Sequence, residues 1–202
     1  IEKKSVNNIM TALYAFVVIS FFITIVDIII RFPLQSEMID YNDIQAIVIN
    51  VLALLIQIVS FAYGFVNAIR GMLSPKRMGA VITAFFAATC ITGTGNMVIY
   101  SNVQIVLWWI VLIIPNIVGA VATFAYFVLG KKSKIYSIII YLVAIWGMFR
   151  IIYSNYNLIV HANQYLSMNS TVRLVLEIAI HCLVIYQTYV LWIKRQNATD
   201  IS

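Results

Sequence analysis

Six long apolar runs, separated by short polar linkers, occupy almost the whole chain. They cover about residues 9–30, 44–69, 79–100, 103–129, 135–159 and 172–193. A helix needs about 20 apolar residues to cross a hydrocarbon core ~30 Å thick. Exposed backbone polar groups are costly in lipid, so these runs are expected to be helices. The sequence therefore predicts an all-α, polytopic membrane protein: a six-transmembrane-helix bundle that forms one transmembrane domain over residues 1–202.

The composition agrees with this class. Hydrophobic residues make up 63% of the chain and charged residues 10%, whereas a soluble domain has roughly 45–50% apolar and about 25% charged residues. This difference excludes a soluble globular domain, a disordered chain and a coiled coil. The first run is longer than the apolar core of a signal peptide, so we expect a retained helix. Cys90 and Cys182 lie within apolar runs and are expected to be buried, reduced thiols.

The basic residues predict the orientation. Ten of the thirteen fall on one side of the alternating spans: Lys3, Lys4, Arg70, Lys76, Arg77, Lys131, Lys132, Lys134, Lys194 and Arg195. Because cytoplasmic loops carry an excess of Lys and Arg, this pattern predicts cytoplasmic N- and C-termini. The net charge of +6 then reflects topology, and no soluble basic face remains for nucleic acid. The Ile-, Asn- and Lys-leaning composition favours a bacterial plasma membrane.

Several charged residues fall inside the predicted spans, always toward the outer side. Asp27 lies near the outer end of the first span, Arg150 in the outer half of the fifth, and Glu177 within the sixth. Arg173, Glu177 and His181 are spaced four apart, so they share one helix face. Ionisable groups at this depth usually face a bundle interior or a water-filled cavity. We therefore expect Arg150 and Glu177 to meet at similar depth.

Uncharged polar residues add to this outer half. Asn50 lies in the second span, and Asn96 ends a Gly-rich stretch from Thr92 in the third. Asn116 follows Pro115 and is expected to break the fourth helix near the membrane midplane, as in the broken helices of transporters. The candidate ligand-binding residues are Asp27, Asn50, Asn96, Arg150, Arg173, Glu177 and His181. The alternative interpretation makes Arg150–Glu177 and Asp27–Arg31 structural ion pairs that lock the helices together.

A stripe of small residues marks a possible interface. Ala80, Ala84 and Ala88 recur every four positions on the third span, and such faces let two helices approach closely. The stripe predicts either packing within the bundle or contact with a partner membrane subunit.

The sequence contains few of the motifs that mark catalytic or metal sites. His161 and His181 lie on different elements, and no Walker loop, GxGxxG or GxSxG motif is present. We therefore predict no catalytic residue, metal ligand or cofactor.

The predicted architecture resembles the substrate-binding subunits of energy-coupling factor transporters, which are six-helix bundles of similar length with inner termini and a polar outer half. The resemblance is one of architecture. It implies a solute-binding membrane fold and a transmembrane coupling partner. In that family an Ala-xxx-Ala face on the first helix meets the partner, whereas here Ala12 and Ala15 are three apart and the alanine stripe is on the third span.

Three functions follow from these patterns. The first is a transport or solute-binding subunit that takes a small polar ligand from the outer side, with energy coupling supplied by a partner. The second is a non-catalytic accessory or assembly subunit of a larger membrane complex, in which the polar residues hold helices together. The third is a small membrane enzyme, an intramembrane hydrolase that would use Glu177 and His181. We favour the first.

Overall fold

The computed structural model describes residues 2–35, 41–99, 103–154 and 168–199, and no strand occurs within them. The elements are α1 (Glu2–Gln35), α2 (Tyr41–Ile69), α3 (Pro75–Ile99), α4 (Val103–Thr123), the π-helix η2 (Phe124–Val128), α5 (Lys134–Ser154) and α8 (Met168–Thr199). Each of the predicted apolar runs coincides with a helix, or with α4 and η2 together. The all-helical fold is therefore confirmed.

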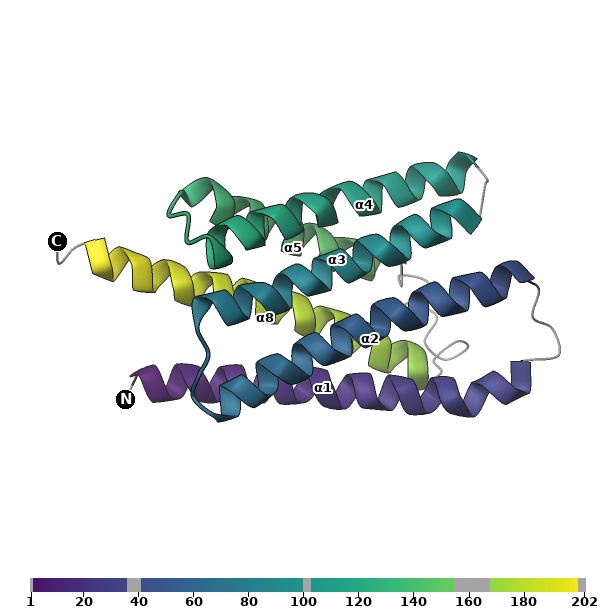
Figure 1. Cartoon of the computed structure of the whole chain (residues 1–202), viewed down its shortest axis with the longest axis horizontal. Coiled ribbons are helices and arrows are strands. Elements are labelled where there is room, and N and C mark those ends of the chain that lie inside the picture. The colour runs from purple at the N-terminus through teal and green to yellow at the C-terminus, as the bar shows by residue number, and fades with distance from the viewer. Residues whose placement is uncertain (1, 36–40, 100–102, 155–167, 200–202) are drawn as a thin grey trace.

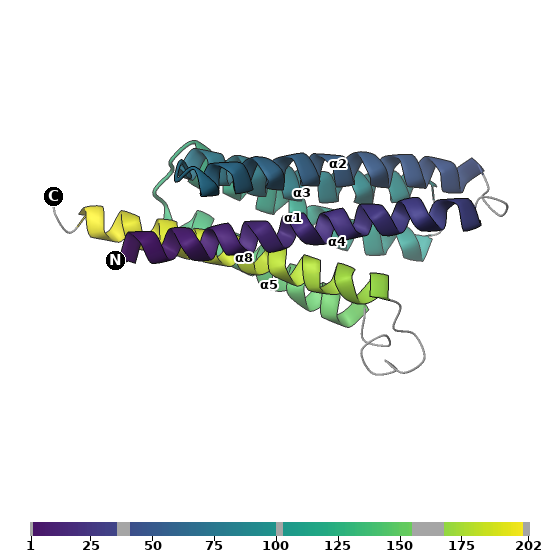
Figure 2. The same cartoon turned by 90° about the horizontal axis from the view of Figure 1, so that it is seen from below.

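The helices stand side by side, and the chain closes on itself. Each helix contacts the next in sequence from α1 to α5, α5 contacts α8, and α8 returns to contact α1. Both termini and the turn between α2 and α3 lie at one end of the bundle, which we call the terminal end (Figure 1). The opposite end is called the far end. Seen from below, α5 and α8 diverge from α2 and α3 toward the far end (Figure 2).

Glycine ends two helices at the terminal end. Gly71 has a φ of 65°, a conformation that glycine adopts without a steric penalty. Its N–H donates to the Ala68 carbonyl, and the Met72 N–H donates to the Asn67 carbonyl, which is the Schellman pattern of a helix C-terminus. Gly130, with a φ of 67°, similarly follows η2. The exposed basic residues Arg70 and Lys131 stand directly beside these glycines.

The outer surface of the bundle is apolar. Within the described residues, five helical stretches are long and apolar enough to cross a membrane: Ile47–Ile69, Pro75–Gly95, Ile110–Val128, Lys134–Tyr153 and Leu174–Ile193. The described apolar stretch of α1, Asn8–Ile23, is shorter. Large side chains such as Phe22, Val59 and Leu142 are exposed on the outside of the helices. A water-soluble protein rarely exposes so much contiguous apolar surface, so this surface suits contact with a lipid bilayer.

Close helix contacts are made over glycines. A methyl group at Gly93 would press into Ile113 of α4, and one at Gly95 would press into Ile49 of α2. Glycine therefore lets α2, α3 and α4 approach one another, as small residues do in membrane proteins. The Gly-rich stretch that begins at Thr92 leaves α3 helical as far as Ile99. Its two glycines act in packing.

Two expectations about local structure are wrong. Pro115 does not break the fourth helix, because α4 runs from Val103 to Thr123 through it. A proline removes a single N–H donor from the ladder, and helices in membranes tolerate this where neighbours satisfy the freed groups. The departure from α-helix comes later, in η2, where the Leu129 N–H donates to the Phe124 carbonyl. Cys90 and Cys182 are free thiols as expected, but Cys182 is exposed on α8.

Candidate solute-binding cavity

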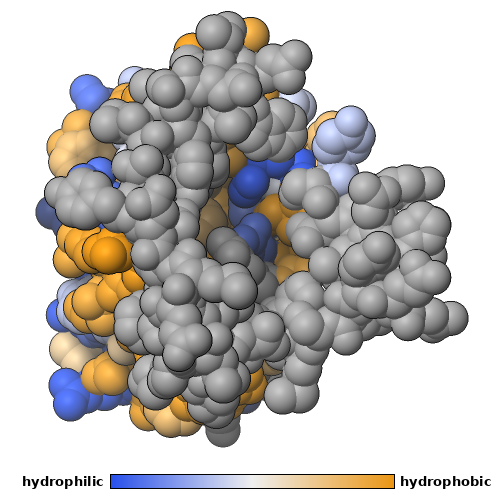
Figure 3. Space-filling model, turned by 90° about the vertical axis from the view of Figure 1, so that its right-hand side faces the viewer, coloured by the Kyte–Doolittle hydropathy of each residue, from blue (hydrophilic) through white to orange (hydrophobic). Residues whose placement is uncertain are grey.

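A cavity of about 420 Å³ lies between the helices in the half of the bundle nearer the far end. All six long helices contribute to its wall. Figure 3 looks onto the far end and shows hydrophilic residues inside a hollow near the centre of the bundle. The polar residues that line the cavity are Asn50, Gln57, Thr89, Thr92, Asn116, Arg150, Glu177 and His181. Polar groups therefore share the cavity wall with apolar ones, in the middle of a molecule whose outside is apolar.

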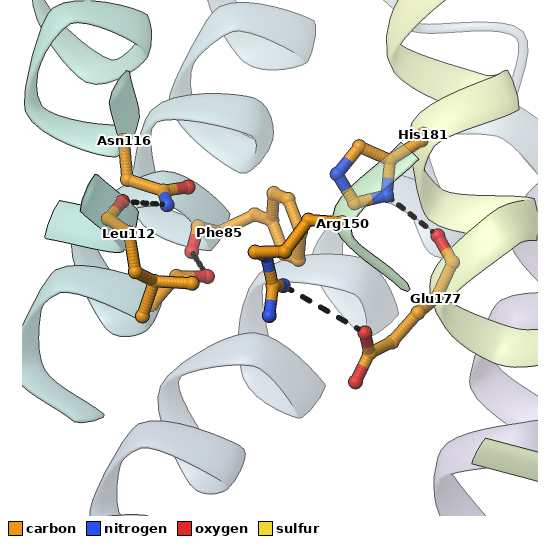
Figure 4. Close-up of polar contacts among 7 residues, drawn as sticks. Phe85, Leu112, Asn116, Arg150, Glu177 and His181 are labelled. Carbon is orange, nitrogen blue, oxygen red and sulfur yellow. Dashed lines mark hydrogen bonds and ion pairs between the residues drawn. The ribbon is translucent and has the colours of Figure 1, made fainter. Parts of the chain in front are cut away.

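Arg150 and Glu177 form an ion pair across the cavity wall (Figure 4). Arg150 lies about one turn before α5 ends, and Glu177 lies in the third turn of α8. Arg150 Nη2 is 4.0 Å from Glu177 Oε2, and the two side chains are 23% and 30% exposed. The predicted meeting of these residues is confirmed. A charge-assisted hydrogen bond between such groups is usually about 2.7–2.9 Å long, so this contact is loose, and both groups present surface to the cavity.

His181 lies one turn deeper on α8 and is held from three sides. Its Nδ1 is 2.7 Å from the Glu177 carbonyl oxygen. A carbonyl can only accept, so Nδ1 carries the proton in this contact. The imidazole packs where a side chain at Gly147 would stand, and it meets the Phe85 ring edge-on at 5.6 Å between centroids. His181 thus contacts the backbone carbonyl of Glu177 through Nδ1.

Asn116 and Thr89 bring polar groups from the opposite wall. Asn116 Nδ2 donates to the Leu112 carbonyl at 2.7 Å, and Figure 4 shows its amide on the side that faces Phe85 and Arg150. Thr89 Oγ1 donates to the Phe85 carbonyl at 3.0 Å. Each side chain satisfies a donor within its own helix. An oxygen that accepts hydrogen bonds remains on each of them.

The structure brings together four of the seven candidate ligand-binding residues. Asn50, Arg150, Glu177 and His181 all line the cavity. The side chains of the other three, Asp27, Asn96 and Arg173, lie outside the described part of the structure. Whether these residues bind a ligand remains a prediction.

Sequence reasoning missed several lining residues, among them Gln57, Thr89 and Trp146. Gln57 could have been found, because it is a polar residue in the middle of an otherwise apolar run. Thr89 gives no such signal, since threonine is common in membrane helices and bonds its own backbone. Trp146 resembles any lipid-facing aromatic residue in a sequence.

The alanine stripe is divided between the inside and the outside of the bundle. Ala88 is fully buried, Ala84 is partly buried and Ala80 is exposed. Ala88 is therefore not available to a partner subunit, and packing within the bundle accounts for it. Of the three alanines, only Ala80 presents an exposed side chain.

Within the described residues, no three His, Cys, Asp or Glu side chains come together in a way that could hold a metal ion. Glu177 and His181 offer two possible ligands on one helix, but Nδ1 of His181 is hydrogen-bonded to the Glu177 carbonyl.

Comparisons of the chain with models of protein families, with curated proteins and with solved structures give no match.

Proposed function

We propose that this chain is a solute-binding or transport subunit of a membrane, and that it takes a small polar ligand from its far end. The observation that carries the proposal is the cavity of about 420 Å³ with Arg150 and Glu177 in its wall. Ligand pockets usually have volumes of about 300–1,000 Å³. Protein interiors are otherwise close-packed, with few voids larger than a water molecule. A bundle that needed only a structural ion pair would have no reason to keep this space.

The distribution of charge supports an outward-facing site. Exposed basic residues gather at the terminal end: Arg70, Lys76, Lys131, Lys132 and Lys134. By the positive-inside rule this end is cytoplasmic, and the cavity then lies in the outer half. With 34 residues, α1 is long enough to be a sixth span. The proposal therefore has six transmembrane helices with both termini inside, in the plasma membrane of a bacterium.

The site would bind its ligand through complementary groups. Arg150 offers a planar fork of N–H donors, and Glu177 offers carboxylate acceptors. Asn116 and Thr89 add acceptors on the opposite wall. The α2–α3 turn, residues 70–74, is too short to hold a nucleotide-binding domain. Energy coupling is accordingly assigned to a partner subunit.

The test compares variants of the cavity with a variant of the surface. Native mass spectrometry of the gently purified protein should show a bound small molecule, and Arg150→Ala or Glu177→Gln should remove it while the protein still folds. Removing one partner of a buried hydrogen-bonded charge pair typically costs more than about 2 kcal/mol of binding, or at least tenfold in affinity. Arg70→Ala makes the same charge change as Arg150→Ala at an exposed residue outside the cavity and should leave binding intact.

Two other results would replace the proposal. Loss of a co-purifying protein chain in the cavity variants, without any bound small molecule, would indicate an accessory or assembly subunit. Turnover of a lipid or peptide substrate that disappears with His181→Ala would indicate an enzyme.

A further inference from the structure

The charges in the cavity wall are balanced. Among the described residues that line it, Arg150 is the one cation and Glu177 the one carboxylate. An unpaired charge at membrane depth is costly, so such groups remain paired or hydrated. A ligand with a net charge would leave one excess charge in the occupied cavity. A ligand with no net charge preserves the balance.

The ion pair is also spaced in a way that lets a ligand replace it. At 4.0 Å the contact is longer than a direct charge-assisted hydrogen bond. A molecule with both a carboxylate and an ammonium group could bind its carboxylate to the Arg150 guanidinium and its ammonium to the Glu177 carboxylate. The long Arg150–Glu177 contact would then give way to two short ones. Arginine suits this role because its planar fork matches the geometry of a carboxylate.

The wall below the ion pair has aromatic and aliphatic residues beside uncharged polar ones, Gln57, Asn116 and His181. On α5, Trp146 and Val143 stand four and seven residues deeper than Arg150, about 6 and 10 Å at 1.5 Å per residue. From the other helices Phe21 of α1 and Phe85 of α3 reach the same cavity. The charged groups therefore lie nearer the far end, and the deeper wall offers aromatic and aliphatic surface together with uncharged polar groups. This arrangement fits a ligand with a charged head and a body that is mainly apolar.

We propose that the cavity binds a zwitterion with an apolar or aromatic body, the class that includes the apolar amino acids. The inference rests on the proposed function and narrows it to a class of ligand. The carboxylate binds Arg150, the ammonium binds Glu177, and the body lies against Phe85 and Trp146.

The experiment uses three probes that share a phenyl ring and differ in charge. L-phenylalanine is a zwitterion, 3-phenylpropionate is an anion and phenethylamine is a cation. Equilibrium binding to the full chain in lipid nanodiscs should favour phenylalanine at least tenfold. Arg150→Gln leaves Glu177 unbalanced and should shift the preference to phenethylamine. Glu177→Gln leaves Arg150 unbalanced and should shift it to 3-phenylpropionate. Arg70→Gln, outside the cavity, is the matched control and should keep the wild-type order.

The outcomes separate this inference from the proposed function. A wild-type preference for either singly charged probe, or variants that keep the wild-type order, would overturn the zwitterion and leave a solute-binding cavity. A co-purifying molecule that is purely anionic or cationic would do the same. If no probe binds and no small molecule co-purifies, both proposals fail.

Discussion

The two halves of this bundle contain the same helices but fill the space between them differently. In the half near the terminal end, aromatic side chains pack over glycines: Tyr14 lies over Gly64, and Phe127 lies over Gly79. In the half near the far end, α5 and α8 diverge from α2 and α3 (Figure 2), and polar side chains face a cavity. We call these the packed half and the cavity half.

The comparison indicates which contacts stabilise the association of the helices. Lipid is as apolar as leucine, so helices in a membrane gain little from hiding apolar surface and depend on close packing. The packed half supplies that packing, with Tyr14 also accepting a hydrogen bond from Gln187 Nε2. We therefore expect the packed half to contribute the larger share of the stability. The cavity half also has close contacts, over Gly93 and Gly95 between α2, α3 and α4, and its unfilled space lies between these helices and the diverging α5 and α8.

The largest effect is expected when a buried aromatic ring is removed from the packed half. Phe127→Ala removes a ring that is 1% exposed. It should lower the free energy of unfolding by about 3 kcal/mol, the lower end of the range for a buried phenylalanine, because lipid rather than water is the alternative environment. Unfolding in mixed detergent micelles measures the change. Phe124→Ala, in the same π-helix but 45% exposed, is the control and should cost less than about 1 kcal/mol. Equal losses would contradict a packed half.

A smaller effect is expected where a methyl group is added at a glycine. Gly64→Ala would press into the buried Tyr14 ring, and overpacking of this kind costs about 1–3 kcal/mol. Gly147→Ala in the cavity half would press into His181, but that imidazole can turn into the cavity. The Gly147→Ala substitution should cost about 1 kcal/mol of unfolding free energy, the value of the lost hydrogen bond between His181 and the Glu177 carbonyl.

Thermal unfolding of the two glycine variants measures which substitution destabilises the protein more. In a double-mutant cycle, Gly64→Ala should cost less in a Tyr14→Leu background than in the wild type, because leucine makes room for the methyl group. If Gly147→Ala proves the more harmful of the two, the cavity half is the more tightly constrained region, and the comparison is reversed.

The sequence predicted the structural features that follow from membrane thickness and from residue spacing within one helix. Apolar runs of sufficient length located every helix in the part of the chain that the structure describes, and the depths of Arg150 and Glu177 were enough to predict that they meet. These signals are local, or depend only on the fact that consecutive helices are antiparallel. The return of α8 to α1, which closes the ring around the cavity, leaves no such mark in the sequence.

Other features depend on contacts that a sequence does not display. The Gly93 and Gly95 positions suggested a polar, ligand-facing stretch, yet their role is to admit Ile113 and Ile49. Pro115 suggested a break, but the loss of one donor did not outweigh the remaining ladder of α4. Gln57 was overlooked because one amide in an apolar run can face lipid, a neighbour or a cavity, and only the packing decides which.

The smallest expected effect concerns a polar contact in the packed half. Thr83 Oγ1 of α3 is 3.1 Å from Thr123 Oγ1 at the end of α4, and Thr123 also lies 2.9 Å from the Gly119 carbonyl oxygen. Thr123 has a single hydroxyl proton, which that carbonyl attracts, so Thr83 is the donor between the helices. Thr83→Val keeps the shape, removes this donor and leaves Thr123 bonded within its own helix. Hydrogen bonds between membrane helices average about 0.6 kcal/mol, so the unfolding free energy should fall by about that amount.

Thr83→Ser is the matched control, because it keeps the hydroxyl and loses only a methyl group. Both variants are measured by the same detergent unfolding used for Phe127→Ala. A loss above about 2 kcal/mol for Thr83→Val, with Thr83→Ser near wild type, would mean that polar contacts rather than ring packing hold α3 against the end of α4. The packed half would then differ from the cavity half only in which polar groups are paired, and its aromatic rings would be filling space that the hydrogen bonds had already defined.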